Sequence, residues 1–196
     1  MLKKIILATV VAAAASFAQI NIGVHAGLDL NTLWGTGSDD ASTSIGFNAG
    51  VAAKFSLPLL PITLAPEVLA DMRNYGAGDS HVTQWNIDVP VLVRFSVLPI
   101  LYLEGGPFAS FNLAMSAEDD DGHKDKVFEE LYHTNVFEFG LAFGVGTGIL
   151  PFLDIDLRLN LGLTKVYDKV EYTGLLDAYQ PEMSSMQIAL GATYWF

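Results

Sequence analysis

Residues 152–164 read FLDIDLRLNLGLT, and from residue 153 onward apolar and polar or small side chains alternate without a break. The polar or small set consists of Asp154, Asp156, Arg158, Asn160 and Gly162. Successive side chains of a β-strand point to opposite faces of the sheet, so the pattern predicts a strand. It leaves open which face meets water, because soluble and membrane barrels share this alternation with inside and outside exchanged.

The composition favours a membrane barrel over an ordinary globular domain. Hydrophobic residues make up 51% of the 196 residues and charged residues only 16%, and the mean hydropathy is +0.36. Globular domains carry about 25% charged residues. No apolar run reaches the roughly 18 residues that a transmembrane helix needs. The hydrophobicity is therefore spread through alternating segments, which predicts a β-barrel.

The N-terminal residues have the layout of a secretory signal peptide. Lys3 and Lys4 precede the apolar stretch 5–15, and the small residues Ser16 and Ala18 flank Phe17. This layout predicts that residues 1–18 form a signal peptide, removed by cleavage after Ala18, and that residues 19–196 form the barrel domain. The chain has no cysteine, which excludes disulfides and thiolate nucleophiles. Its net charge of −12 argues against a nucleic-acid partner.

Eight alternating segments are long enough to cross a membrane as strands, which takes about 9–11 residues. They are residues 20–30, 45–55, 62–73, 82–95, 100–113, 135–146, 153–164 and 185–196. Short connections (56–61, 96–99 and 147–152) alternate with longer ones (31–44, 74–81, 114–134 and 165–184). This rhythm predicts an all-β fold: an eight-stranded antiparallel up-and-down transmembrane β-barrel with short periplasmic turns and long extracellular loops.

The two alternate sets of side chains differ in a way that predicts which set faces lipid. One set contains no charged residue, whereas the other is rich in glycine, alanine and serine and carries eight carboxylates and four Lys or Arg side chains. Small side chains suit the narrow interior of an eight-stranded barrel. We therefore expect the apolar set to face lipid, with interface aromatics at Phe55, Trp85, Phe95, Phe111 and Phe137.

The inward-facing charges are the main candidate site. The predicted barrel-interior charge network comprises Lys54, Glu67, Asp71, Arg73, Asp88, Arg94, Glu104, Glu138, Asp154, Asp156 and Arg158. Buried charges cost several kcal/mol each unless they are paired, so we expect salt bridges that plug the barrel. A narrow proton or ion path, or carboxylates paired for acid–base chemistry, is the functional alternative.

Four stretches resemble a known family. They are NIDVPVLVRF (86–95), LYLEGGPFASFNL (101–113), FGLAFGVGTGI (139–149) and the C-terminal ALGATYWF (189–196). They resemble strands of eight-stranded outer-membrane β-barrel proteins of the PorT-like and OmpX/OmpA-like kind. The resemblance implies a place in the Gram-negative outer membrane and contact with outer-membrane lipid. It also implies that Tyr194 and Phe196 belong to an assembly signal read by the barrel-assembly machinery.

Neither the loops nor the histidines match a known chemical site. The stretch 116–130 holds seven acids and two lysines, but Phe128 stands where a calcium loop needs glutamate. It is interpreted as a solvated loop, with weak divalent-cation binding as the alternative. His25, His81, His123 and His133 lie in no recognisable motif with Ser80, Ser116 or Ser184. We predict no catalytic residue, no metal site and no cofactor.

The sequence thus predicts a small, non-catalytic outer-membrane barrel with a structural or surface-interaction role, too narrow to be an open porin. Lipopolysaccharide or surface proteins are the candidate loop partners. Three alternatives remain open at this point: a barrel enzyme acting on outer-membrane lipid, an accessory of a secretion system, and a soluble periplasmic lipocalin-like lipid binder.

Overall fold

Eight long strands make up nearly all of the described chain. The structure is a computed structural model that describes residues 19–36, 41–56, 60–77, 80–118, 124–125, 137–164 and 182–196. The long strands are β1 (Gln19–Thr36), β3 (Ser44–Ser56), β4 (Ile62–Ala77), β5 (Ser80–Leu98), β6 (Leu101–Glu118), β8 (Phe137–Leu150), β9 (Leu153–Gly162) and β10 (Glu182–Trp195). Two short strands, β2 (Ala41–Ser42) and β7 (Lys124–Asp125), pair with β4 and β6. In these ranges no helix could cross a bilayer.

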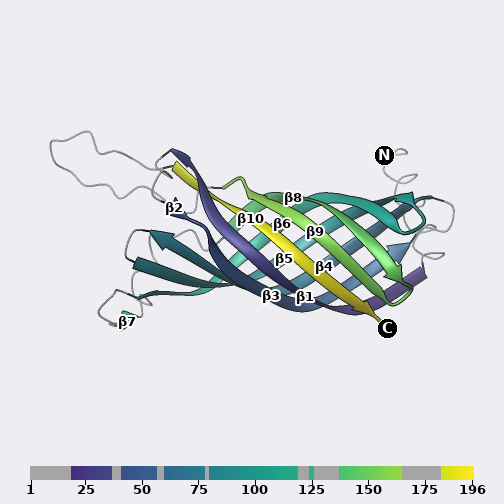
Figure 1. Cartoon of the computed structure of the whole chain (residues 1–196), viewed down its shortest axis with the longest axis horizontal. Coiled ribbons are helices and arrows are strands. Elements are labelled where there is room, and N and C mark those ends of the chain that lie inside the picture. The colour runs from purple at the N-terminus through teal and green to yellow at the C-terminus, as the bar shows by residue number, and fades with distance from the viewer. Residues whose placement is uncertain are drawn as a thin grey trace, which may run out of the picture.

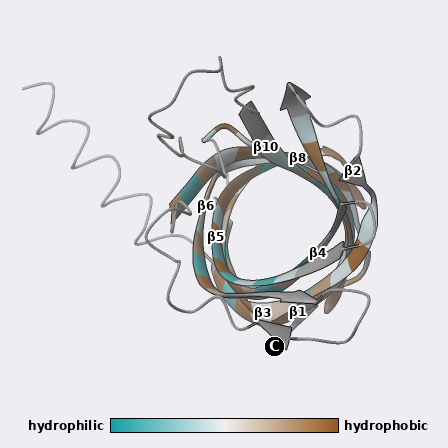
Figure 2. Cartoon of the chain, turned by 90° about the vertical axis from the view of Figure 1, so that its left-hand side faces the viewer, coloured by the Kyte–Doolittle hydropathy of each residue, from teal (hydrophilic) through white to brown (hydrophobic). Residues whose placement is uncertain are grey.

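The long strands close into a barrel (Figures 1 and 2). Each pairs antiparallel with two neighbours in the order β4-β3-β1-β10-β9-β8-β6-β5, and the pairing of β5 with β4 completes the circle. The first and last strands pair from Gly23 opposite Trp195 to Thr36 opposite Glu182. Closure leaves no unpaired strand edge, which a bilayer would not tolerate. The predicted fold class is confirmed.

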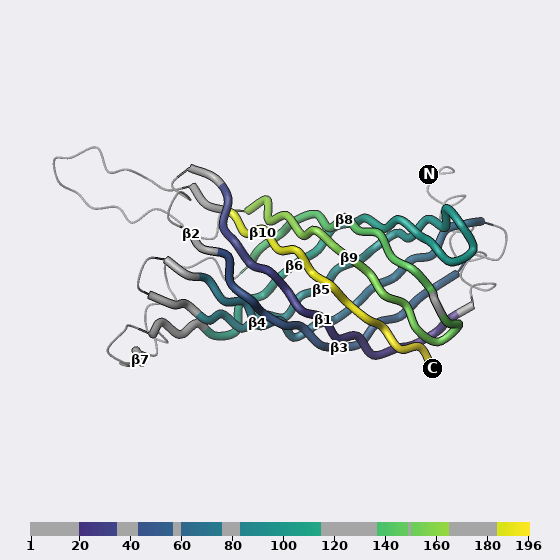
Figure 3. Tube along the Cα trace, in the orientation of Figure 1, coloured from purple at the N-terminus to yellow at the C-terminus, as the bar shows by residue number. Residues whose placement is uncertain are grey.

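The two ends of the barrel differ (Figure 3). The β3–β4, β5–β6 and β8–β9 connections lie at one end, which we call the turn end, and β1 begins and β10 finishes there. At this end the Phe196 amide donates a hydrogen bond of 2.9 Å to the Ile22 carbonyl. Strands β1, β4, β6 and β9 finish at the other end, here called the loop end.

Two predicted loops are largely strand, because in the expected loop 31–44 residues 31–36 belong to β1, residues 41–42 to β2 and residue 44 to β3. We expected residues 74–81 to form a long loop, but β4 and β5 remain paired up to Ala77 opposite Ser80. Strand β6 likewise stays paired with β5 as far as Glu118. The alternating pattern reports which side chains face lipid, whereas backbone pairing continues beyond the lipid into water. The pattern therefore ends before the hydrogen-bonded ladder does.

Several predictions fall on residues outside the described ranges. The signal peptide (1–18), residues 119–123 and 126–130 of the acidic stretch, His123 and His133 are all of this kind.

The barrel directs its apolar set outward and its polar set inward, as neighbouring residues of β1 illustrate. Leu28 is 63% exposed, while Asp29 beside it is 1% exposed. In the hydropathy colours of Figure 2, hydrophilic and hydrophobic residues alternate along the strands. A soluble barrel needs a polar outer surface, so the lipocalin-like alternative is wrong.

Glycines make room for the aromatic side chains that point inward. Tyr102, Phe108 and Trp195 lie directly opposite Gly146, Gly140 and Gly23 on the neighbouring strands. A Cβ at position 146 would collide with the Tyr102 ring, and one at 140 with the Phe108 ring. The small residues of the inner set therefore allow large rings to fill a narrow barrel.

Candidate functional site

A ring of four charged side chains crosses the half of the lumen nearer the turn end. Arg158 donates to Glu67 through Nη1 (2.9 Å to Oε2) and to Glu104 through Nε (2.9 Å to Oε1). Arg94 donates to the same two carboxylates, through Nε to Glu104 Oε2 at 2.9 Å and through Nη2 to Glu67 Oε1 at 3.4 Å. All four side chains are buried. Because β4 and β9 lie on opposite sides of the circle, the Glu67–Arg158 pair spans the barrel.

Polar side chains around this ring extend it toward the turn end. Asp154 accepts hydrogen bonds from Arg94 Nη1 at 3.1 Å and from the Trp195 indole at 2.8 Å. Lys54 lies 3.9 Å from Asp154 and 4.2 Å from the centre of a Trp195 ring. Asp156 pairs with Arg158 at 3.4 Å. Together these residues close the turn-end half of the lumen.

A second cluster, nearer the loop end, is built around Arg73. The Arg73 guanidinium contacts Asp71 at 2.6 Å, Asp88 at 2.6 Å and Glu138 at 2.8 Å. Ser110 donates to Asp88, and Ser185 donates to Glu138. Arg73 thereby joins β4 to β5 and β8, and the two serines bring β6 and β10 into the cluster through Asp88 and Glu138.

The two clusters have different charge balances. In the turn-end half Lys54, Arg94 and Arg158 face Glu67, Glu104, Asp154 and Asp156. In the loop-end half, Arg73 is accompanied by Asp71, Asp88, Glu138 and also Asp29, whose carboxylate accepts bonds from Asn48 at 2.9 and 3.0 Å. The loop-end half is therefore the more acidic of the two.

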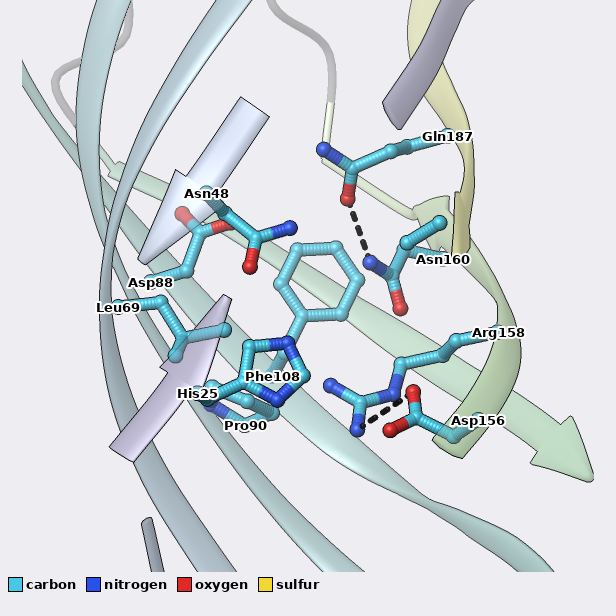
Figure 4. Close-up of a pocket in the computed structure, with 11 residues that line it drawn as sticks. His25, Asn48, Leu69, Asp88, Pro90, Phe108, Asp156, Arg158, Asn160 and Gln187 are labelled. Atoms are coloured by element: carbon cyan, nitrogen blue, oxygen red, sulfur yellow. Dashed lines mark hydrogen bonds and ion pairs between the residues drawn. The ribbon is translucent and has the colours of Figure 1, made fainter. Parts of the chain in front are cut away.

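A small cavity is lined both by Asp88 of the loop-end cluster and by Arg158 of the turn-end ring (Figure 4). It is lined by His25, Asn48, Asp88, Phe108 and Arg158 among others, and its free space is about that of one water molecule. Asn48 Oδ1 and Asp156 Oδ2 are buried there without a hydrogen-bond partner. A solute larger than water does not fit this space.

Among the described residues, the histidine inside the barrel lies beside a buried hydroxyl. His25 Nδ1 lies 2.8 Å from the hydroxyl of Thr193, a residue that is fully buried. A nucleophile needs access to its substrate, which this hydroxyl lacks. Among the residues that the structure describes, no three His, Asp or Glu side chains are grouped so that they could hold a metal ion.

The structure places all eleven residues of the proposed charge network in ion pairs inside the barrel. The proposed network omitted Asp29 and several neutral partners: Asn48, Ser110, Ser185, Trp195 and Gln187, whose side-chain amide donates to Asp71 at 3.1 Å. All of these residues lie at inward-facing positions of the alternating pattern, and this is the sequence feature that could have identified them. Trp195 also lies at an inner position, but the proposed network contained only charged side chains.

The aromatics proposed for the membrane interfaces lie on the outer surface. Trp85, Phe95, Phe111 and Phe137 are exposed, whereas Phe55 is half-buried. Toward the loop end, the Phe111 and Phe137 rings pack with their centres 5.3 Å apart. At the turn end, Tyr194 packs against both Phe152 and Phe196 at 5.6 Å. Phe152 was not among the aromatics proposed from the sequence.

Known proteins share this architecture. A family model described as an outer membrane protein β-barrel domain matches residues 16–168. No curated protein matches the chain in sequence. Neisserial surface protein A is similar in fold, with 14% identity, a TM-score of 0.55, and coverage of 89% of this chain and 97% of its own. Ail, the attachment invasion locus protein of Yersinia pestis, has 14% identity, a TM-score of 0.52, and coverage of 91% and 99%.

Proposed function

This chain belongs to the outer membrane β-barrel domain family, and from that premise we propose that it is a closed, non-catalytic barrel that acts through its surface loops. It is a small barrel of the bacterial outer membrane, of the same type as Ail and Neisserial surface protein A. The observation that carries the proposal is the ring of Glu67, Arg94, Glu104 and Arg158, which fills the lumen from wall to wall. With the interior closed, the loop end is the part left to meet partners.

The closed interior predicts that the purified barrel does not conduct solutes. An eight-stranded barrel is just wide enough to be filled by side chains, and here paired charges occupy that space. In planar lipid bilayers, we expect the folded protein to give no steady conductance above that of protein-free membranes. An open-pore conductance from protein whose gel mobility shifts on heating would contradict the closed-barrel proposal.

The charge of the chain suggests which partners the loops select. Ail was solved in complex with the heparin analogue sucrose octasulfate. The present chain has a net charge of −12 and seven acids in the stretch 116–130, so a bare polyanion would be repelled. We propose that the loops contact lipopolysaccharide phosphates through bridging divalent cations, or a cationic surface protein.

A loop variant tests this choice of partner. Replacing Asp119, Asp120 and Asp121 by asparagine is expected to weaken magnesium-dependent binding of lipopolysaccharide severalfold, because carboxylates are the ligands that hard cations prefer. The measurement is binding to purified lipopolysaccharide with and without a chelator. Lipopolysaccharide binding that neither the three substitutions nor the chelator weakens would exclude cation bridging through this stretch.

The route to the membrane follows from the same assignment. We propose that residues 1–18 are cleaved on export, that the turn end faces the periplasm, and that Tyr194 and Phe196 form the signal read by the barrel-assembly machinery. Both rings are exposed on the outer surface of the last strand, which supports their recognition by another protein. The mass of the mature protein would reveal the cleavage site.

A further inference from the structure

The three turns at the turn end share an unusual composition. Each contains Leu-Pro followed by another apolar residue, at residues 60–62, 98–100 and 150–152. No charged residue occurs in 55–63, 95–101 or 147–153. Turns that project into water are normally rich in glycine, proline, asparagine, aspartate and serine, whereas these turns combine their prolines mainly with leucine, isoleucine, valine and phenylalanine. These turns therefore have a composition better suited to an apolar environment.

The apolar side chains of these turns are exposed. We define the turn-end rim as Leu60, Leu98, Ile100, Leu150, Phe152 and Phe196, which are between 42% and 75% exposed. The β3–β4, β5–β6 and β8–β9 turns and the end of β10 distribute the rim around the whole circumference of the barrel. An encircling rim fits a surrounding lipid leaflet better than a protein that binds one side.

The rim continues the lipid-facing belt without a polar break. Along β5 the outward side chains Val91, Val93, Phe95 and Val97 are all exposed and apolar, and they lead directly to Leu98. At the loop end of the same strand, the outward set instead passes from Trp85 to Thr83. The apolar surface is thus displaced along the barrel axis toward the turns.

The length of β5 sets the depth at which the rim lies. A tilted strand rises about 2.5 Å per residue along the barrel axis, so the thirteen steps from Trp85 to Leu98 cover about 33 Å. The outward apolar band of an outer-membrane barrel is about 25 Å tall. When this span is centred on the band, Trp85 and Leu98 each lie about 4 Å beyond its edges, close to the two boundaries between headgroups and acyl chains.

We propose that the turn-end rim anchors the barrel in a phospholipid leaflet. The Leu-Pro turns insert at the boundary between headgroups and acyl chains and do not project into the aqueous compartment. This inference rests on the proposed membrane embedding and extends it by naming the lipid contact of the turns. It also implies that the excess length of β4, β5 and β6 projects from the membrane at the loop end.

The absence of cysteine allows a direct test with single labels. Ile100→Cys and Phe152→Cys place an environment-sensitive NBD fluorophore on the rim. Val91→Cys serves as the control in the belt, and Thr43→Cys, an exposed position near the loop end, as the aqueous control. Each labelled protein is refolded into phosphatidylethanolamine–phosphatidylcholine vesicles, and a heat-dependent gel shift verifies folding.

The expected result is that rim labels are quenched severalfold less by aqueous iodide than the label at position 43, and are quenched by lipids carrying a shallow nitroxide. The inference would be overturned if iodide quenched the rim labels as strongly as the label at position 43. If the label at position 91 were still shielded in that case, the membrane embedding itself would stand. Shielding from iodide without quenching by the lipid nitroxide would indicate a second copy on the rim and would also overturn it. A label at position 91 open to iodide would instead contradict the embedding itself.

Discussion

Replacing Arg73 by alanine is expected to lower the free energy of unfolding by about 3–5 kcal/mol, the usual cost of breaking a buried ion pair by removing one partner. Arg73 is 2% exposed and contacts three carboxylates, from Asp71, Asp88 and Glu138. The variant leaves these groups buried without their cation. The measurement is urea-induced unfolding of protein refolded in detergent micelles, followed by the gel shift between folded and unfolded forms.

Two comparisons make this prediction specific. Lys54→Ala is expected to cost less than about 1 kcal/mol, because Lys54 is partly exposed and Asp154 keeps its bonds to Arg94 and Trp195. Arg94→Ala should cost less than Arg73→Ala, since Arg158 still pairs with both Glu67 and Glu104. Adding Asp88→Asn to Arg73→Ala should recover part of the loss by removing one unpaired charge. Equal losses for Arg73→Ala and Lys54→Ala would show that the loop-end cluster contributes no more than a surface pair.

Replacing Leu190 by arginine is expected to cost about 2–4 kcal/mol, the penalty for a cation on the lipid face at the bilayer midplane. Leu190 is 55% exposed and lies near the middle of β10, between Leu28 and Leu157 on the neighbouring strands. Neither neighbour offers a partner for the new charge. The folded fraction after refolding into vesicles, and the unfolding free energy of that fraction, measure the effect.

The same substitution at the edge of the belt is the matched control for Leu190→Arg. Ile20 is equally exposed at the start of β1, and Ile20→Arg should cost at most about 1 kcal/mol because penalties fall near the interfaces. If both variants lose the same unfolding free energy, the cost of a cation on the outer face does not depend on its depth in the membrane. The assignment of this face to lipid would then be wrong.

The direction of the side chains was available from the sequence. A strand has a side-chain period of two, so one correct assignment of inside and outside extends along every strand. Asp154, Asp156 and Arg158 from the alternating stretch 152–164 are all buried in the lumen, while Leu157 between them is exposed. The lack of charge in the outer set and the small residues of the inner set were enough to choose the orientation.

The alternating pattern predicted the ends of the strands less well than the directions of their side chains. Residues 74–77 pair with β5 although their composition suggested a loop. Backbone hydrogen bonding is insensitive to side-chain polarity once a strand has left the lipid. The alternation of apolar residues could therefore define the lipid-facing span but not the full length of the barrel.

By itself, the sequence determined that this chain forms an eight-stranded membrane barrel with charges inside, because the period of two is a local property of each strand. The tertiary structure alone decided which charges meet. Arg158 and Glu67 are 91 residues apart, and Arg73 and Glu138 are 65 apart. These pairs come from strands that are not neighbours in the sheet. They form only when closure of the barrel brings its opposite walls within reach of two side chains.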